Sequence, residues 1–161
     1  MDKKPNRWWD VLAAIGWLAI MILAASRIEA TEWARDLDLV TTGAVLSAIL
    51  GLAVGWSRFS ARTATWLAVI YSVLLVPWIL GSSVGQGVAW LERLYSLGAR
   101  LGWAVGALVY NQPIRDPLLL ISALVLIFWL LALTGGYHLV RHGRPWVPLA
   151  LTGLLMMLIE F

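Results

Sequence analysis

Long apolar runs separated by short polar stretches dominate the chain. A helix needs about 20 apolar residues to cross the roughly 30 Å hydrocarbon core of a membrane, because it rises about 1.5 Å per residue. Five runs approach that length, and we place them at residues 8–25, 39–56, 64–80, 117–134 and 145–161. The pattern predicts an all-α fold, a polytopic transmembrane helical bundle that forms a single domain over residues 1–161.

The segment 81–116, between the third and fourth runs, has a different pattern. Within it, the sequence WLERLYSLGARLGW places Glu92, Ser96 and Arg100 on one stripe of a helix, with leucines around the rest. This predicts an outer amphipathic helix that lies at the membrane interface or docks on the bundle. A re-entrant segment and a short sixth span are the alternatives, and the arginines of the segment argue against the span.

Signals for helix ends mark the fourth run most clearly. Asp116 precedes Pro117, which is a typical N-cap followed by proline in the first turn. Gly135 and Gly136 come about 18 residues later and predict the end of this helix.

Small residues recur at intervals of four along the second run. The series is Gly43, Ser47, Gly51 and Gly55, and its last two members form a GxxxG motif. In lipid there is no hydrophobic drive between helices, so association depends on close packing of backbones past small residues. The stripe therefore predicts a helix–helix contact, within the chain as the first expectation, with a second copy in a homo-oligomer as the alternative.

Composition supports a membrane location. The chain is 61% hydrophobic and 13% charged, whereas a soluble domain has about 45 to 50% apolar and about 25% charged residues. The formal net charge is +3, but the basic residues sit at the ends of the apolar runs and not in a patch. We therefore expect the lipid bilayer as the partner and no nucleic acid.

The distribution of Lys and Arg predicts an orientation, because cytoplasmic flanks carry the excess. With the N-terminus inside, the cytoplasmic set outnumbers the outer one. The cytoplasmic set is Lys3, Lys4, Arg7, Arg58, Arg62, Arg141 and Arg144, and the outer set is Arg27, Arg35, Arg93, Arg100 and Arg115. We predict a cytoplasmic N-terminus with the first run as an uncleaved anchor, and an extracytoplasmic C-terminus after five crossings. Because the chain stops flush with the fifth run, we expect it to be the front part of a longer protein.

Most tryptophans fall near the ends of the runs, as in an interfacial aromatic belt. This set comprises Trp8, Trp9, Trp33, Trp56, Trp78, Trp103, Trp129 and Trp146.

Candidates for chemistry are few. His138 and His142 have the spacing of two metal ligands on one helical face, but position 139 is leucine where a zinc-protease motif requires glutamate, and no third ligand is near. We expect them to face headgroups. The chain has no cysteine and no phosphate-binding loop, dinucleotide fingerprint or nucleophile elbow. We therefore expect no catalytic, cofactor-binding or metal residues and no cofactor.

Several segments together resemble the N-terminal membrane region of bacterial transglutaminase-like membrane proteins. They are RIEATEW, LGLAVGWSRFS, YSVLLVPWIL, WLERLYSLGARLG and NQPIRDPLLLISALVLIFWLLALTGGYHLVRHGRPW. In that family several spans precede an extracytoplasmic papain-like core whose activity depends on a Cys, His, Asp triad. Nothing in these 161 residues matches the triad. The resemblance implies a non-enzymatic domain of the bacterial cytoplasmic (inner) membrane that anchors and orients such a core downstream.

Two other hypotheses stay open. One is a small self-contained transporter or channel subunit, in which the glycine stripe forms an oligomer interface and residues 81–116 form a gate. The other is a membrane-embedded enzyme acting on lipids, with Arg and His at the cytoplasmic edge binding phosphate, although the chain offers no convincing nucleophile.

Overall fold

The computed structural model describes residues 7–161 apart from 33, 85–86, 111, 113–115, 144–145, 147–148, 151, 154–155 and 158–161, with the backbone alone for 7–10. The described part is helical and contains no strand. Its five helices are α1 (Arg7–Glu29), α2 (Asp38–Trp56), α3 (Ala61–Gly81), α4 (Trp90–Val109) and α5 (Leu118–His142). This confirms the predicted all-α class.

Four of these helices are long and apolar enough to cross a membrane, namely α1, α2, α3 and α5. They overlap the first four predicted runs and are compatible with a multi-pass membrane protein. The fifth predicted run, 145–161, falls largely outside the described residues. Those of its residues that are described are helical, and Leu149 and Met156 pack half-buried against the core.

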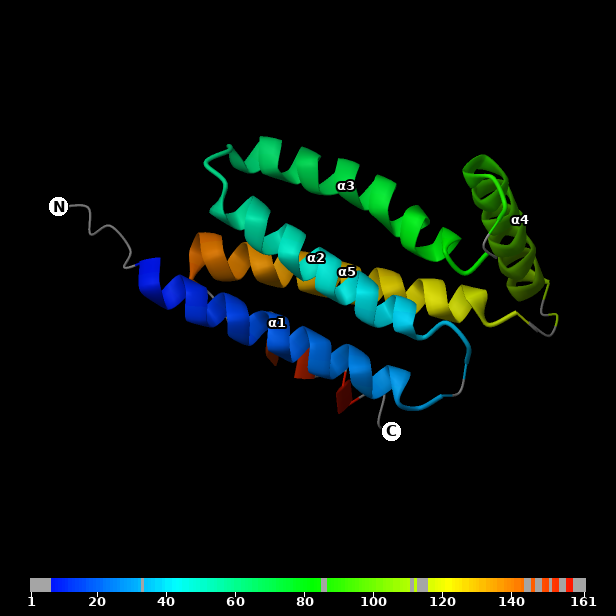
Figure 1. The fold of residues 1–161 in the computed structure, drawn as a ribbon, viewed down its shortest axis with the longest axis horizontal. Coiled ribbons are helices and arrows are strands. Elements are labelled where there is room, and N and C mark those ends of the chain that lie inside the picture. Colours follow the sequence, from blue (N-terminus) through cyan, green and yellow to red (C-terminus); the bar gives the residue numbers. More distant parts are fainter. Residues whose placement is uncertain are drawn as a thin grey trace.

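The core lies where α2 packs on α5 (Figure 1). α2 runs between α1 and α3, and α5 lies behind it, antiparallel to α3. Val40, Ala44 and Ala48 of α2 are completely buried, as are Val125 and Phe128 of α5. The buried residues of α2 include small ones and those of α5 include large ones, a combination that allows two helices to pack closely.

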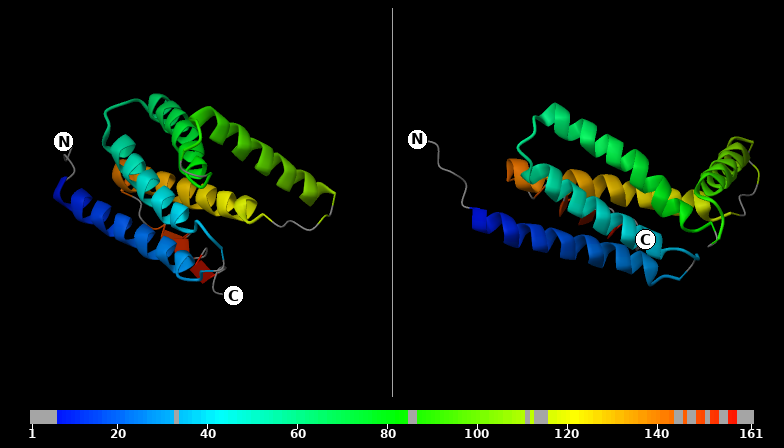
Figure 2. Two further views of the ribbon diagram at one scale, coloured as in Figure 1. Left: turned by 45° about the vertical axis from the view of Figure 1, so that its right-hand side comes forward. Right: turned by 45° about the horizontal axis from the view of Figure 1, so that its top comes forward.

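Helix α3 is held mainly at one end. Its buried residues are Ala64 near its start and Val76, Ile79, Leu80 and Gly81 near its end. Figure 2 shows its first half diverging from α2 and α5, while its last turns approach α4. The helix begins at Ala61 because Ser60 caps it, its Oγ accepting a hydrogen bond of 3.2 Å from the Thr63 N–H.

The predicted end of the fourth run is wrong. α5 continues through Gly135 and Gly136 to His142, and it ends at Gly143, which adopts the left-handed conformation with φ 61°. Gly135 and Gly136 are both buried. At Gly136 the neighbouring α2 occupies the space that a side chain would need, so this glycine serves packing and does not terminate the helix.

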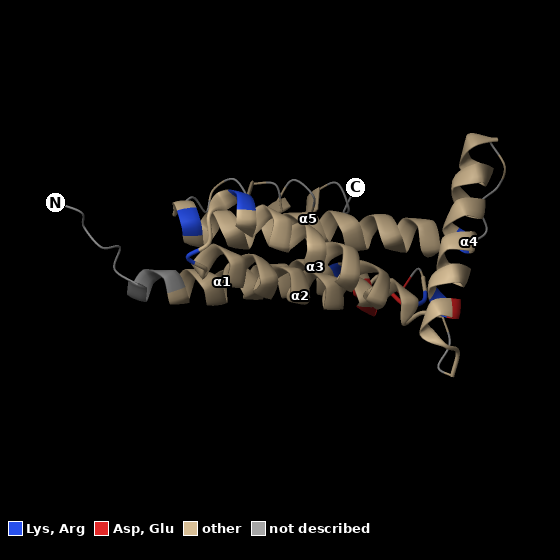
Figure 3. Ribbon diagram, turned by 90° about the horizontal axis from the view of Figure 1, so that it is seen from above, with Lys and Arg blue, Asp and Glu red and all other residues tan. Residues whose placement is uncertain are grey.

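Helix α4 lies across one end of the bundle (Figure 3). The predicted amphipathic helix within residues 81–116 is therefore present, with Leu97, Ala104 and Ala107 buried on one side. It follows the end of α3 and precedes the start of α5, and these are the two helices that it contacts.

Candidate functional site

The stripe of small residues on α2 faces α5. Gly43, Ser47, Gly51 and Gly55 are all buried. A Cβ built on Gly51 would overlap the carbonyl oxygen of Leu133 and stand 3.0 Å from its carbonyl carbon. A Cβ on Gly55 would lie 3.0 Å from Cβ of Val140. The two backbones therefore approach so closely that even a methyl group does not fit at Gly51.

On the other side of this contact lies Gly136 of α5, a residue that the sequence pattern assigned only to the end of a helix. A Cβ on Gly136 would stand 3.0 Å from the Leu52 nitrogen and 3.1 Å from the Ala48 oxygen. Glycines thus face each other's backbones across the α2–α5 contact. The signal in the sequence was Gly135-Gly136 itself, which a purely local rule assigns to a helix end.

Ser47 shows why the stripe tolerates a hydroxyl. Its Oγ donates to the Ala44 carbonyl oxygen at 3.1 Å, within its own helix, and the residue is completely buried. The polar atom is thereby satisfied without a partner on α5, so at this position serine acts as a small residue. Among the described residues, no buried side-chain nitrogen or oxygen lacks a hydrogen-bond partner.

Two buried indoles connect helices that are distant in the sequence. Trp129 Nε1 of α5 donates to Ser72 Oγ of α3 at 2.8 Å, and Trp17 Nε1 of α1 donates to the Ala132 oxygen of α5 at 3.2 Å. Trp129 is 1% exposed. The aromatic-belt prediction is therefore wrong for Trp129, whose N–H finds a protein partner in the middle of the bundle and does not reach an interface.

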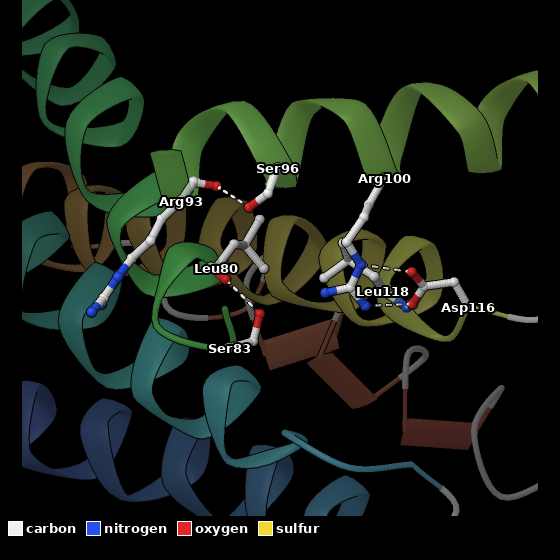
Figure 4. Close-up of polar contacts among 7 residues, drawn as sticks. All are labelled: Leu80, Ser83, Arg93, Ser96, Arg100, Asp116 and Leu118. Atoms are coloured by element: carbon white, nitrogen blue, oxygen red, sulfur yellow. Dashed lines mark hydrogen bonds and ion pairs between the residues drawn. The ribbon is translucent and has the colours of Figure 1, made fainter. Parts of the chain in front are cut away.

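One ion pair joins α4 to the start of α5, at the end of the bundle across which α4 lies (Figure 4). Arg100 Nε donates to Asp116 Oδ2 at 2.8 Å and Arg100 Nη2 donates to Asp116 Oδ1 at 2.9 Å. The Leu118 N–H also donates to Asp116 Oδ1, at 3.0 Å. The N-cap of α5 is Pro117, so the predicted cap at Asp116 is displaced by one residue. Its carboxylate still accepts from the first N–H of α5 and binds α4 through a two-pronged contact of the kind that arginine makes with carboxylates.

These bonds shift the titration of the carboxyl. The hydrogen bonds from Arg100 hold the pKa of Asp116 below its usual range, with a smaller effect in the same direction from the Leu118 N–H and a partial desolvation that opposes both. A carboxyl whose pKa is lowered by folding stabilises the fold at pH values above its unfolded pKa of about 3.9. That contribution is lost as the pH falls through the lowered, folded-state pKa.

Asp116→Asn is expected to loosen α4 without unfolding the bundle. Asparagine can still accept from the Leu118 N–H, so the change isolates the charge, and for a partly exposed pair we expect a loss of about 0.2 to 1 kcal/mol. Faster hydrogen exchange in α4, with α2 and α5 unchanged, would show it, and so would the disappearance of the acid-dependent step in stability. Glu92→Gln, on the exposed face of the same helix, is the control. Equal exchange in both variants would contradict the assigned role of the pair.

Cationic and imidazole side chains gather at the other end of the bundle. Arg141 Nη2 donates to the Phe59 oxygen at 2.9 Å, which ties the end of α5 to the loop between α2 and α3. The rings of His138 and His142 lie 5.0 Å apart between centroids. Within the described part of the chain, these histidines are joined by no further His, Cys, Asp or Glu that would complete a metal-binding group.

Comparison with known proteins assigns no family to the chain. No family, curated protein or solved structure matches it. What the chain does must therefore be argued from its own geometry, which consists of a tightly packed α2–α5 contact, a helix fixed across the acidic end and a basic opposite end.

Proposed function

We propose that residues 1–161 form a multi-pass domain of the bacterial cytoplasmic membrane that anchors and orients an extracytoplasmic, transglutaminase-like core encoded downstream. The apolar surface of the four long helices supports a location in lipid. On α3, Trp66, Ile70, Val73 and Leu74 are all at least half exposed. In water such a continuous apolar face would promote aggregation, whereas in a bilayer it is solvated by lipid chains.

The observation that carries the proposal is the placement of α4. This helix lies across the bundle and is fixed by the Arg100–Asp116 pair, yet it leaves large apolar and aromatic side chains uncovered. Leu91, Tyr95 and Tyr110 are each more than three-quarters exposed. An amphipathic helix in this position suits the headgroup level, where its aromatic side chains would contact lipid and its backbone would present a firm platform to a domain outside the membrane.

Charge supports the proposed orientation. Every acidic side chain that the structure describes lies at the α4 end: Glu29, Glu32, Asp36, Asp38, Glu92 and Asp116. Of the twelve Lys and Arg residues of the sequence, seven fall in the segments that we place at the other end and five in those at the α4 end. We assign the richer end to the cytoplasm because Lys and Arg are enriched on that side. The proposal includes the fifth span at 145–161, which would bring the C-terminus to the α4 side.

Reporter fusions test this topology. Alkaline phosphatase joined after Gly87, before α4, is expected to be active, and joined after Ser57 it is expected to be inactive. A cytoplasmic fluorescent reporter at the same two positions should give the reverse pattern and serves as the control for expression. Activity after Ser57, or inactivity after Gly87, would overturn the orientation.

The anchoring role is tested on the gene. We expect the reading frame to continue beyond Phe161 into a segment with Cys, His and Asp in that order, and the purified full-length product to show thiol-dependent acyl transfer. A stop codon directly after Phe161 would refute the anchoring proposal and favour the self-contained transporter or channel subunit. That alternative has little support from the geometry, since no Asp, Glu, Lys or Arg occupies the middle of any of the four long helices.

A further inference from the structure

An apolar groove opens on the side of the bundle, between α3 and α5. Its volume is about 380 Å³, and Gly51 and Val54 of α2 form its floor. It exists because the first half of α3 diverges from the bundle, as described above. Along α3 its wall extends from Ala64 to Val73, which is about 14 Å at 1.5 Å per residue. This is about half of a hydrocarbon core of roughly 30 Å, the depth of one leaflet.

The groove offers almost no free hydrogen-bonding groups. Thr65 Oγ1 donates to the Ala61 oxygen at 3.0 Å, and Thr134 Oγ1 donates to the Leu130 oxygen at 2.6 Å. Ser72 Oγ donates to the Ala68 oxygen at 2.7 Å while it accepts from Trp129. Because these hydroxyls are satisfied by the protein, the lining suits a hydrocarbon chain better than a polar solute.

Both walls of the groove end in an arginine. On α3, Arg62 precedes Thr65 by three residues and Val69 by seven, so it lies on the same helical stripe as these lining residues. On α5, Arg141 follows Tyr137 by four residues and Thr134 by seven, which again is the lining stripe. Each wall thus has an arginine on its lining stripe, about one helical turn beyond the groove.

These arginines have no acidic partner in the described part of the chain. Arg62 and the nearby Arg58 are exposed and form no hydrogen bond or ion pair there, and Arg141 uses one nitrogen on the Phe59 carbonyl. The described carboxylates lie at the opposite end of the bundle. Asp10 belongs to α1, a helix that contacts α5 but not α3. The mouth is thus positively charged, and planar guanidinium groups match phosphate geometry.

We propose that this groove binds one acyl chain of an anionic phospholipid from the leaflet at the arginine end, with Arg62 and Arg141 holding the phosphate. A second copy of the protein fits less well. Copies in one membrane share an orientation, so their arginine-rich ends would meet at the same depth and repel each other. The lipid site does not depend on which side of the membrane is the cytoplasm, so the reporter fusions can fail without affecting it.

Retention of defined lipids tests the headgroup part of the proposal. The full chain, purified in a mild detergent, is mixed with equal amounts of phosphatidylglycerol and phosphatidylcholine of identical acyl composition, and bound lipid is measured by native mass spectrometry. We expect preferential retention of phosphatidylglycerol, reduced about fivefold by Arg62→Gln. Arg93→Gln, on α4 at the other end, is the control and should leave the preference intact. Equal retention of both lipids by the unaltered protein would overturn the proposal.

A matched pair of variants tests the groove itself. Val69 lines the groove and is 47% exposed, whereas Ile70 is 50% exposed and does not line it. Val69→Trp should fill the groove and reduce retention of both lipids severalfold, while Ile70→Trp should not. Loss of lipid in both variants, or in neither, would contradict an acyl chain in the groove. A dimer that dissociates on Val69→Trp alone would assign the groove to a second copy instead.

Discussion

Gly51→Ala is expected to destabilise the domain in mild detergent by about 1 to 3 kcal/mol or more, although alanine is the better helix former. The reason is steric. A Cβ at this position overlaps the carbonyl oxygen of Leu133 and stands 3.0 Å from its carbonyl and Cα carbons. These are backbone atoms of α5, which cannot rotate aside as a side chain could, so the two helices must separate along the contact that holds the core.

A glycine on another helix provides the control. Gly16 of α1 has no heavy atom within 4 Å of the position that its Cβ would take. Gly16→Ala is therefore expected to be neutral or to stabilise by up to about 1 kcal/mol, through helix propensity alone. Thermal unfolding followed by circular dichroism measures both variants. The same sign of change in both would contradict close packing at Gly51.

Trp129→Ala is expected to cost about 3 to 5 kcal/mol, the usual range for removing a large buried aromatic side chain. Trp129 is 1% exposed and belongs to the largest fully buried side chains of the described core. Its removal would leave a cavity between α3 and α5 and would take the N–H from Ser72 Oγ, the hydrogen bond that joins these two helices. We expect α3 to separate first, because its first half is only loosely packed.

Two variants divide this effect into its parts. Ser72→Ala removes the hydrogen bond and leaves the buried Trp129 N–H unpaired, so it should cost about 1 to 3 kcal/mol, less than the loss of the whole side chain. Trp66→Ala removes a tryptophan that is 61% exposed on the same helix as Ser72, and it should change the unfolding midpoint little. Equal losses from Trp129→Ala and Trp66→Ala would show that burial in the core does not govern the stability of the bundle.

The sequence predicts the helices better than it predicts their ends. The runs 39–56 and 64–80 lie within a few residues of α2 and α3, because apolar length is a direct physical requirement for crossing lipid. The amphipathic pattern at Glu92, Ser96 and Arg100 likewise indicates α4. The predicted stop at Gly135-Gly136 fails because a glycine that ends a helix does so for local reasons, whereas Gly136 packs against the backbone of α2.

The candidate sites depend on the tertiary fold more strongly than the helices do. The small-residue stripe on α2 predicts a helix–helix contact. Because all the long helices are similarly apolar, the sequence does not identify α5 as the helix that the stripe contacts. The bond between Trp129 and Ser72 joins positions 57 residues apart, and the two arginines at the groove mouth come from different helices.

The sequence alone determines that the chain forms long apolar helices, where they begin, and that most acidic residues fall in the segments at one end of them. It does so because a backbone in hydrocarbon must satisfy its own hydrogen bonds, which each segment achieves by itself as a helix. Only the tertiary structure decides which helices touch, which glycines face a backbone, and where the bundle leaves a groove. Those outcomes depend on shape complementarity between segments, a property that no single segment carries.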